Sequence, residues 1–460
     1  MNVELSLGYV REVTGGDLVR GAEQMAINGI STDSRQVGSG ELFFALAGET
    51  FDGHDYVEKA FAQGASAAVV SRLEPKTYGN QEALILVTDT IQALQDLAAA
   101  WRTKFDLPLI AITGSIGKTT TRDMLSAILS TRWHTLTTQA NYNNEIGLPL
   151  TLLRIGPEHQ AAVVELAMRG SGEIRRLTQI TQPTVAVITN VERVHLETLG
   201  SLENIARAKC EILESIRDFA VINGDDPYLA KAAADYICPR YTFGYNESCD
   251  FRLLEVGLRN QKLNFRARLQ QTEANFEFAI PSRQLAGNVL AAIAVAYLYG
   301  FSVDEIRQGL SQYQPTGNRL NITDLNQGGI LINDTYNANP VSMMAALEVG
   351  REIAEGNRFV AVLGDMYELG DYEDKGHREV GAKAAQLGVD LLVTLGEKAR
   401  LISEEAQKCG LPLENIYHFP VKEDSVTFLR SQISKGDTVL FKASRGMQLE
   451  ALIEEWLKAD

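Results

Sequence analysis

The sequence holds few of the residues that mark secreted or membrane-spanning proteins. Its four cysteines, Cys210, Cys238, Cys249 and Cys409, are scattered over 460 residues, and no two have the C-x-x-C spacing of a metal or redox site. We interpret them as reduced thiols, which favours a cytoplasmic protein. No apolar run approaches the roughly 20 residues of a membrane span, and the N-terminus has no secretory apolar region. Integral membrane association is therefore not expected.

Basic residues are also scarce. The chain has 43 Lys and Arg against 59 Asp and Glu, a formal net charge of −16. A nucleic-acid binder normally carries a basic patch, so no nucleic-acid partner is expected. An anionic small substrate is not excluded, because charges more than about 10 Å away are screened at moderate salt. With 45% hydrophobic and 22% charged residues, the composition fits a large enzyme with several ordinary cores.

The most informative segment is 113–121. It follows the apolar run 107–112 and precedes an amphipathic stretch, so a buried strand, a glycine turn and a helix start come in the order that forms a phosphate cradle. The strict G-x-x-x-x-G-K-[ST] pattern is not met, because Ile112 occupies the first glycine position. The shorter T-G-x-x-G-K-T form remains, in which Lys118 reaches the terminal phosphates and the Thr119 hydroxyl reaches a magnesium ion. A chance Gly-Lys-Thr turn is the alternative, but the flanking strand and helix favour a nucleoside triphosphate site.

Hydrophobic periodicity predicts an α/β protein with three domains. The first is a small mixed α/β N-terminal domain over 1–106, with strands at 42–46, 67–71 and 83–87 and helices at 56–63 and 91–104. The second is a central P-loop ATPase domain over 107–314, where short apolar runs alternate with helical stretches and predict a mostly parallel sheet. The third is a C-terminal Rossmann-like domain over 315–460, after the turn 314–318, with strands at 329–332, 359–363, 391–395 and 438–441.

Polar residues follow several of these predicted strands, which is where open parallel sheets bind ligands. Glu165 closes an apolar strand, and a hard oxygen ligand there suits magnesium; the alternative is an ordinary surface acid at a strand end. Asn190 and His195 follow the next strand, although a lone histidine there is more often a packing or hydrogen-bonding group. Lys209 lies on a predicted helix and by itself reads as a solvated lysine.

Taken together, these motifs resemble the Mur ligases, the ATP-dependent amide-forming enzymes of peptidoglycan precursor synthesis, over essentially the whole chain. The central signature is Thr113-Gly114-x-x-Gly117-Lys118-Thr119-Thr120, then Asn141-x-Asn143-Asn144-Glu145-x-Gly147-x-Pro149, Glu165, Asn190, His195, Ala206-x-x-Lys209-x-Glu211-Ile212 and Asn223-x-Asp225-Asp226. Two departures stand out. Ser282 and Gln284 replace the glycine and histidine of the family's G-x-H-x-x-x-N pattern before Asn288, and Ala140 replaces the common glycine before Asn141.

The C-terminal third is most similar to the family members that add D-alanyl-D-alanine. It carries Asn333-Asp334-Thr335-Tyr336-Asn337-Ala338-Asn339-Pro340-x-Ser342-Met343, Gly364-Asp365-Met366-x-Glu368-Leu369-Gly370 and Lys442-Ala443-Ser444-Arg445-Gly446-Met447. The resemblance implies ATP-dependent ligation of D-alanyl-D-alanine to UDP-N-acetylmuramoyl-tripeptide through an acyl phosphate. Another amide ligase of the superfamily, either an amino-acid-adding Mur ligase or a folylpolyglutamate synthetase, is the first alternative. A P-loop regulatory or carrier ATPase is the second.

The resemblance also implies cofactors and residue roles. ATP is expected at Gly114, Ser115, Ile116, Gly117, Lys118, Thr119, Thr120, Asn288, Arg319 and Asp334, the last two closing on it from the third domain. Two Mg²⁺ ions are expected at Thr119, Thr138, Glu165, His195 and a carbamylated Lys209, with Lys118, His195 and Lys209 as the catalytic residues. The uridine nucleotide is expected at Asp33, Ser34, Arg35, Ala45 and Leu46, and the dipeptide at Asn337, Asn339 and Ser444. The protein is expected to act as a monomer on these small molecules.

Overall fold

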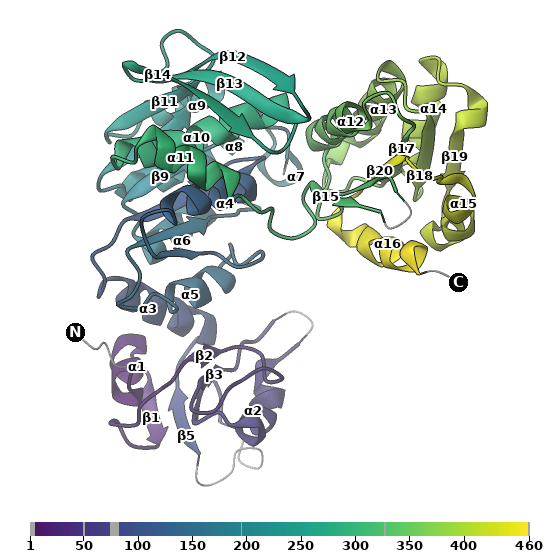
Figure 1. Ribbon diagram of the computed structural model, residues 1–460. Coiled ribbons are helices and arrows are strands. Elements are labelled where there is room, and N and C mark those ends of the chain that lie inside the picture. The colour runs from purple at the N-terminus through teal and green to yellow at the C-terminus, as the bar shows by residue number, and fades with distance from the viewer. Residues whose placement is uncertain (1–4, 49–50, 74–81, 195, 326–327, 459–460) are drawn as a thin grey trace.

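The computed structural model describes residues 5–48, 51–73, 82–194, 196–325 and 328–458 (Figure 1). The strands form a five-stranded, a nine-stranded and a six-stranded sheet that follow one another along the chain. The predicted α/β fold with three sheet-containing regions and mostly parallel sheets is therefore confirmed. The domain limits 1–106, 107–314 and 315–460 stay predictions, and each sheet lies inside one of these ranges.

The N-terminal domain is a five-stranded sheet with helices on both faces. The strand order is β1-β5-β4-β3-β2, and only β1 runs antiparallel to its neighbour. Helices α1 and α3 pack on one face and α2 on the other. The elements are β1 Asp17–Arg20, β2 Ile30–Ser31, β3 Leu42–Phe44, β4 Ala67–Val70, β5 Ala83–Leu86, α1 Leu7–Thr14, α2 Val57–Gln63 and α3 Thr90–Arg102.

The central domain is a three-layer sandwich around the sheet β14-β13-β12-β11-β10-β9-β6-β8-β7. Helices α4, α10 and α11 cover one face, and α5, α6, α8 and α9 cover the other. The strands are β6 Leu109–Thr113, β7 Thr135–Thr137, β8 Ala161–Glu165, β9 Val185–Ile188, β10 Phe219–Asn223, β11 Arg240–Gly244, β12 Phe251–Arg259, β13 Lys262–Leu269 and β14 Thr272–Phe278. The helices are α4 Lys118–Leu129, α5 Gly147–Leu152, α6 Glu173–Thr181, α7 Leu196–Leu199, α8 Leu202–Cys210, α9 Pro227–Ala233, α10 Ala286–Leu298 and α11 Val303–Ser311.

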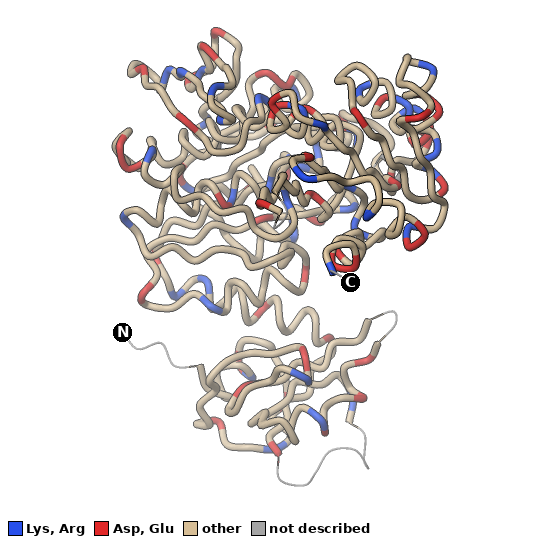
Figure 2. Tube along the Cα trace, turned by 45° about the vertical axis from the view of Figure 1, so that its right-hand side comes forward, with Lys and Arg blue, Asp and Glu red and all other residues tan. Residues whose placement is uncertain are grey.

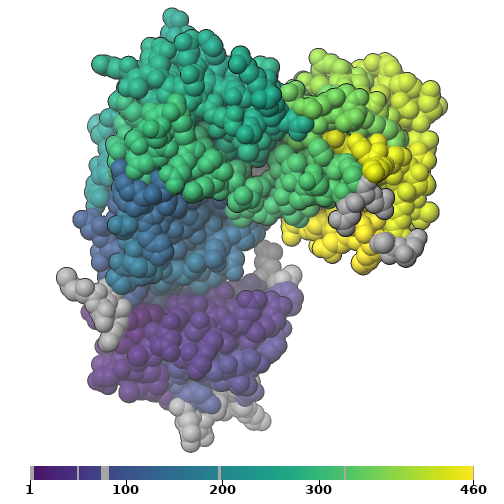
Figure 3. Space-filling view, viewed as in Figure 1, coloured from purple at the N-terminus to yellow at the C-terminus, as the bar shows by residue number. Residues whose placement is uncertain are grey.

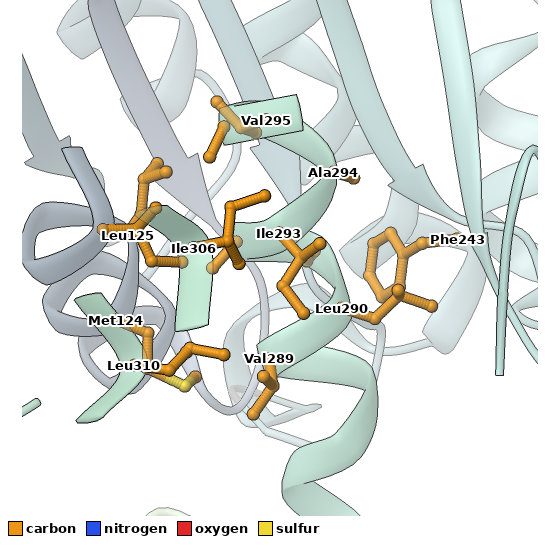
Figure 4. Close-up of a cluster of buried hydrophobic side chains, with 14 of the residues drawn as sticks. Met124, Leu125, Phe243, Val289, Leu290, Ile293, Ala294, Val295, Ile306 and Leu310 are labelled. Carbon is orange, nitrogen blue, oxygen red and sulfur yellow. The ribbon is translucent and has the colours of Figure 1, made fainter. Parts of the chain in front are cut away.

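The α10 helix is the centre of the larger core. Its side chains are apolar around most of its circumference, so it is buried between the sheet and the neighbouring helices rather than lying on the surface. Figure 4 shows residues of α10 pointing toward Met124 and Leu125 of α4, Phe243 of β11, and Ile306 and Leu310 of α11. This packing fixes α4, the helix that follows the predicted phosphate loop, against the body of the domain.

A tight crossing of α11 over α4 gives a stability prediction. A Cβ added to Gly309 would overlap the backbone of Ile128, which no side-chain rotation can relieve. We expect Gly309→Ala to lower the free energy of unfolding by about 1–3 kcal/mol, as overpacking of a dense core does. Gly257→Ala is the matched control, since a Cβ there meets open space. Equal urea midpoints for the two variants would show that α11 does not pack this closely.

The antiparallel edge β12–β14 is where the structure departs from the predicted alternation of strands and helices. These three strands follow one another without a helix, and β12 and β13 are joined by Asn260 and Gln261, both in the left-handed region at φ 52° and 55°. The β13 strand has every second residue buried and the others polar, which is typical of a sheet edge facing solvent. No strand was predicted here because the apolar runs are interrupted at every other residue.

The C-terminal domain is a six-stranded sheet of order β15-β16-β20-β17-β18-β19, parallel except for β15. Helices α12, α13 and α14 pack on one face, and α15 and α16 on the other. The predicted strands correspond to β16, β17, β18 and β20, whereas β15 and β19 were not predicted. The elements are β15 Asn321–Asp324, β16 Ile330–Asn333, β17 Phe359–Gly364, β18 Leu391–Leu395, β19 Ile416–Phe419, β20 Thr438–Lys442, α12 Pro340–Ala354, α13 Glu373–Gln386, α14 Arg400–Lys408, α15 Ser425–Gln432 and α16 Leu449–Leu457.

Acidic and basic residues are interspersed along the chain in all three domains (Figure 2). All four cysteines are free thiols. Within the described residues, no helix is long and apolar enough to cross a membrane.

Candidate functional site

A cavity of about 480 Å³ lies between the carboxyl ends of the central strands and the C-terminal domain. Figure 3 shows the C-terminal domain adjoining the central domain and standing apart from the N-terminal domain. The cavity brings together predicted ATP, metal and dipeptide residues from both later domains. Those lining it are Ser115, Ile116, Gly117, Lys118, Thr119, Thr120, Glu165, Asn288, Arg319, Asp334, Asn337 and Asn339.

The predicted phosphate loop joins β6 to α4 in the backbone shape that its glycines allow. Gly114 has φ +148° and Gly117 φ +83°, and a Cβ on either would collide with a neighbouring side chain, Thr189 or Asn288. Asn190, which follows β9, accepts a hydrogen bond from the Ile116 N–H at 2.9 Å and donates one to the Ile116 carbonyl at 3.1 Å. Asn190 therefore shapes the loop, and the N-terminus of α4 is left facing the cavity.

Lys118 begins α4 directly after this loop, and its amine folds back over the loop. The amine donates to the Gly114 carbonyl at 2.9 Å and to the Ser115 carbonyl at 3.2 Å. Burial lowers its pKa, Glu165 opposes that shift, and Arg319 adds to it. The loop thus holds a lysine that a phosphate anion would favour in its charged form.

Glu165 ends β8 inside the protein, so its interpretation as a surface acid is wrong. Glu165 is only 2% exposed. One oxygen accepts from the Thr119 hydroxyl at 2.7 Å, and the other accepts from the Asn143 amide at 2.9 Å. The Thr138 hydroxyl accepts from the Glu165 N–H at 3.3 Å but does not line the cavity.

The electrostatics at Glu165 favour an ionised carboxylate. Burial on its own would raise the pKa of Glu165, but the nearby charges of Lys118, Arg319 and Arg122 outweigh it, so the pKa is lowered. The described residues contain no group of three or more acidic, histidine or cysteine side chains suited to a metal. Mg²⁺ is usually held by one or two carboxylates together with substrate phosphates and water. The adjacent hydroxyl of Thr119 and carboxylate of Glu165 fit such a site.

The position of Lys209 also differs from what its local sequence pattern indicates. It was read as solvated, yet it is 2% exposed at the end of α8. Burial lowers its pKa well below the usual lysine value, and Lys118 lowers it further. Two lysines are therefore near each other, and in the described part of the chain no carboxylate forms an ion pair with Lys209. His195, the other expected ligand of a second metal, lies outside the described residues.

On the C-terminal side, the cavity is walled by residues that follow β16. Asp334 accepts from Lys442 at 2.5 Å and from the Leu320 N–H at 3.1 Å. The Arg319 guanidinium lies 3.8 Å from the centroid of the Tyr336 ring, which lines the cavity. Lys442 and Tyr336 were quoted in the sequence motifs but were given no role.

The three predicted dipeptide residues differ in position. Asn339 caps α12 by accepting from the Ser342 N–H at 2.8 Å, and Asn337 accepts from the Arg445 N–H at 3.4 Å; both line the cavity. Ser444 is 3% exposed and does not line it. Its hydroxyl donates to the Ala338 carbonyl at 3.3 Å, so it supports the loop that carries both asparagines.

The predicted uridine-nucleotide residues lie at one edge of the N-terminal sheet. Asp33, Ser34 and Arg35 come just after β2, and Ala45 and Leu46 come just after β3. Because β2 and β3 are parallel neighbours, both groups lie at their carboxyl ends. Asp33 and Arg35 form an ion pair at 2.8 Å that lowers the pKa of Asp33 to about 2.

A second cavity of about 370 Å³ adjoins the first and shares Asn190, Gln284 and Asn288 with it. It is also lined by Asn223, Asp225 and Tyr245. Gln284, which stands at the family's histidine position, donates to Glu348 of α12 at 3.4 Å. This places the residue at the junction of the two cavities and next to the C-terminal domain.

The other departure from the family pattern also has a structural consequence. Ala140 adopts φ 47°, a left-handed conformation that glycine takes without strain. The carbonyl of Ala140 accepts from Arg122 at 3.2 Å. Alanine therefore holds the left-handed turn before Asn141 at a modest conformational cost. Arg122 itself was missed by the sequence reasoning, because an arginine on a helix gives no sign of burial.

Three family models match the chain, one for each domain. The Mur ligase family catalytic domain matches residues 26–102, the Mur ligase middle domain matches 112–296, and the Mur ligase glutamate ligase domain matches 318–445.

Curated and solved proteins match over the full length. UDP-N-acetylmuramoyl-tripeptide--D-alanyl-D-alanine ligase of Bacillus subtilis (strain 168) is 38% identical over 439 residues, which is 95% of this chain and 94% of the relative. A crystal structure of MurF from Acinetobacter baumannii has a TM-score of 0.88 at 34% identity and covers 100% of both chains. The MurF ligase of Thermotoga maritima in complex with ADP has a TM-score of 0.78 at 27% identity, over 93% of this chain and 97% of that one.

Proposed function

The chain belongs to the Mur ligase family, and we propose that it joins D-alanyl-D-alanine to UDP-N-acetylmuramoyl-tripeptide, converting ATP to ADP and phosphate. Curated relatives that match 95% or more of the chain carry this activity in their names. The observation that carries the proposal is the shared cavity, in which the phosphate loop faces the asparagine-rich segment after β16. An amide ligase needs a nucleotide and an amine acceptor in such proximity.

The chemistry requires few protein acids or bases. A carboxylate oxygen of the tripeptide attacks the γ-phosphorus of ATP, an O–P bond forms, and the bond to ADP breaks. The dipeptide amine then attacks the carbonyl carbon of this acyl phosphate, phosphate leaves, and the amine loses a proton. Both steps concentrate negative charge on oxygens, which Lys118, the loop N–H groups and α4 can stabilise. Magnesium, when bound, offsets the same charge.

The remaining roles follow from the placement of the residues. We assign Arg319, Asp334 and Asn288 to the nucleotide, with the adjoining second cavity available for its base. We assign Asn337 and Asn339 to the dipeptide. Ser444 supports the loop that carries them through its hydrogen bond to the Ala338 carbonyl. The residues after β2 and β3 would hold the uridine nucleotide.

We further propose two Mg²⁺ ions and a carbamylated Lys209. A buried lysine without a carboxylate partner, close to another lysine, is costly to keep charged. The neutral amine attacks the carbon of CO₂, an N–C bond forms, and one proton leaves the nitrogen. The product is an anion with hard oxygen ligands, which would compensate Lys118 and suit magnesium.

This assignment predicts a rescue. Lys209→Ala should lose ligase activity and regain part of it when short carboxylic acids are added, since they supply the missing anion. Wild-type enzyme should lose activity in buffer depleted of carbon dioxide and recover it with bicarbonate. Full activity of Lys209→Ala in depleted buffer would show that the residue is only structural.

The function itself is tested by phosphate release with a panel of acceptors. We expect ATP turnover to be nearly silent until UDP-N-acetylmuramoyl-tripeptide and D-alanyl-D-alanine are both present. Turnover with free amino acids or with folate substrates would instead indicate another ligase of the superfamily. Turnover without any small acceptor would indicate a regulatory or carrier ATPase.

We also propose that the protein works in the cytoplasm as a monomer. Four free thiols are consistent with a reducing compartment. Sedimentation at micromolar concentration should give the mass of a single 50.5 kDa chain.

A further inference from the structure

Arg122 and Asp123 form a buried ion pair directly behind the phosphate loop, and none of the roles above uses it. The Arg122 residue is fully buried on α4. Its Nε and Nη2 donate to Asp123 Oδ1 at 2.8 and 2.5 Å. A buried ion pair is seldom retained for stability alone, because desolvation offsets most of the attraction.

The second contact of Arg122 is with the proposed metal carboxylate. Its Nη1 lies 3.7 Å from Glu165 Oε2. At such a distance in a poorly solvated site, opposite charges attract much more strongly than they do in bulk water. Arg122 is thus shared between Glu165, which lines the cavity, and Asp123, which does not.

The second oxygen of Asp123 contacts the connection between domains. Asp123 Oδ2 accepts from the Thr316 N–H at 3.2 Å. Thr316 belongs to the segment between α11 and β15, which Figure 1 shows crossing from the central to the C-terminal domain. Arg319, the cavity residue assigned to the nucleotide, is three residues further along. One continuous set of contacts therefore runs from Glu165 through Arg122 and Asp123 to this connection.

We propose that Arg122 and Asp123 are positioning residues that couple occupancy of the nucleotide–metal site to the placement of the C-terminal domain. The inference rests on the function proposed for that site. A cation beside Glu165 neutralises its carboxylate and repels the Arg122 guanidinium, which is then left with Asp123 as its single carboxylate partner and with the Ala140 carbonyl. Asp123 transmits this change to the backbone of Thr316, and hinges of this kind move with small changes at a few residues.

Asp123→Asn tests the coupling, since a carboxylate accepts on both oxygens whereas an amide accepts on only one. The variant must lose either the Arg122 contact or the Thr316 contact. Asp304→Asn is the matched control, because Asp304 pairs with Arg307 at 3.0 Å on the surface, with its side chain 90% exposed. We measure amide hydrogen exchange of residues 314–320 with and without Mg²⁺ and ADP.

In the wild type and in Asp304→Asn, Mg·ADP is expected to slow exchange at 314–320. In Asp123→Asn that response is lost although Mg·ADP still binds, and KM for the dipeptide rises more than KM for ATP. A merely structural role would lower the melting temperature without separating the two KM values. Should Asp123→Asn not fold, Arg122→Lys, which keeps the charge but loses the fork, should show a partial loss of the response.

Two results would overturn the coupling: no exchange response to Mg·ADP in the wild type, or an equal response in Asp123→Asn. Neither depends on ligation, because the exchange experiment contains no acceptor. Failure of the proposed function would appear separately, as absence of the ligated product from wild-type enzyme.

Discussion

Lys118→Ala is expected to abolish ligation while leaving the fold intact. The substitution removes a point charge from the place where the transferred phosphoryl group carries its negative charge. Losing one such electrostatic group typically lowers kcat by about 10²–10³-fold. The stability should change little, because within the described residues the amine donates its hydrogen bonds to two carbonyls of its own loop.

Two further variants sharpen this result. Lys262→Ala, on the exposed β12–β13 hairpin, removes a surface lysine that pairs with Glu277 and should leave ligation unchanged. Lys118→Arg keeps a positive charge but changes its shape, and should recover only part of the rate. Near wild-type turnover by Lys118→Ala, measured as phosphate release with both acceptors, would remove the phosphate-loop assignment.

Glu165→Gln should produce the other large effect, a loss of magnesium affinity together with rate. The amide keeps the shape of the side chain but not the anionic oxygen beside Thr119. Changes around metal ligands commonly cost 10–100-fold in affinity, so we expect the magnesium concentration for half-maximal activity to rise by at least about tenfold. Glu158→Gln, just before the same strand and exposed, is the matched control.

Magnesium titrations of ligase activity provide the measurement. If the curves of Glu165→Gln and wild type superimpose, Glu165 is not a metal ligand and its burial serves the fold alone. Protein stability is followed in parallel, because the substitution leaves Arg122 with one carboxylate partner instead of two.

The phosphate loop shows how far a sequence can predict a site. A buried strand, two glycines and a lysine at a helix start are local features, and the structure places them as β6, the loop and α4. The C-terminal lining was reached only through family resemblance, since Asp334 and Asn337 come together with Lys118 through domain packing. Contacts of that kind leave no trace in local periodicity.

Two interpretations made from local pattern alone are overturned by burial: the alternative of a surface acid for Glu165 and that of a solvated lysine for Lys209. Glu165 and Lys209 looked solvated because a charged residue at a strand end or on a helix usually is. Both are buried because the central domain covers them. The charge of Glu165 is offset by Lys118, Arg319 and Arg122, whereas Lys209 has no carboxylate partner among the described residues. The strands β12–β14 were not predicted because polar residues alternate with apolar ones along them, so no continuous apolar run marks them as strands.

The most direct test of the account follows one oxygen atom. UDP-N-acetylmuramoyl-tripeptide labelled with ¹⁸O in its terminal carboxylate is converted in the presence of ATP and D-alanyl-D-alanine, and the released phosphate is analysed by mass spectrometry. Ligation through an acyl phosphate predicts that each phosphate carries one ¹⁸O from the carboxylate, in step with formation of the pentapeptide. Phosphate free of the label, with its new oxygen drawn from water, would contradict the assignment and indicate ATP hydrolysis instead.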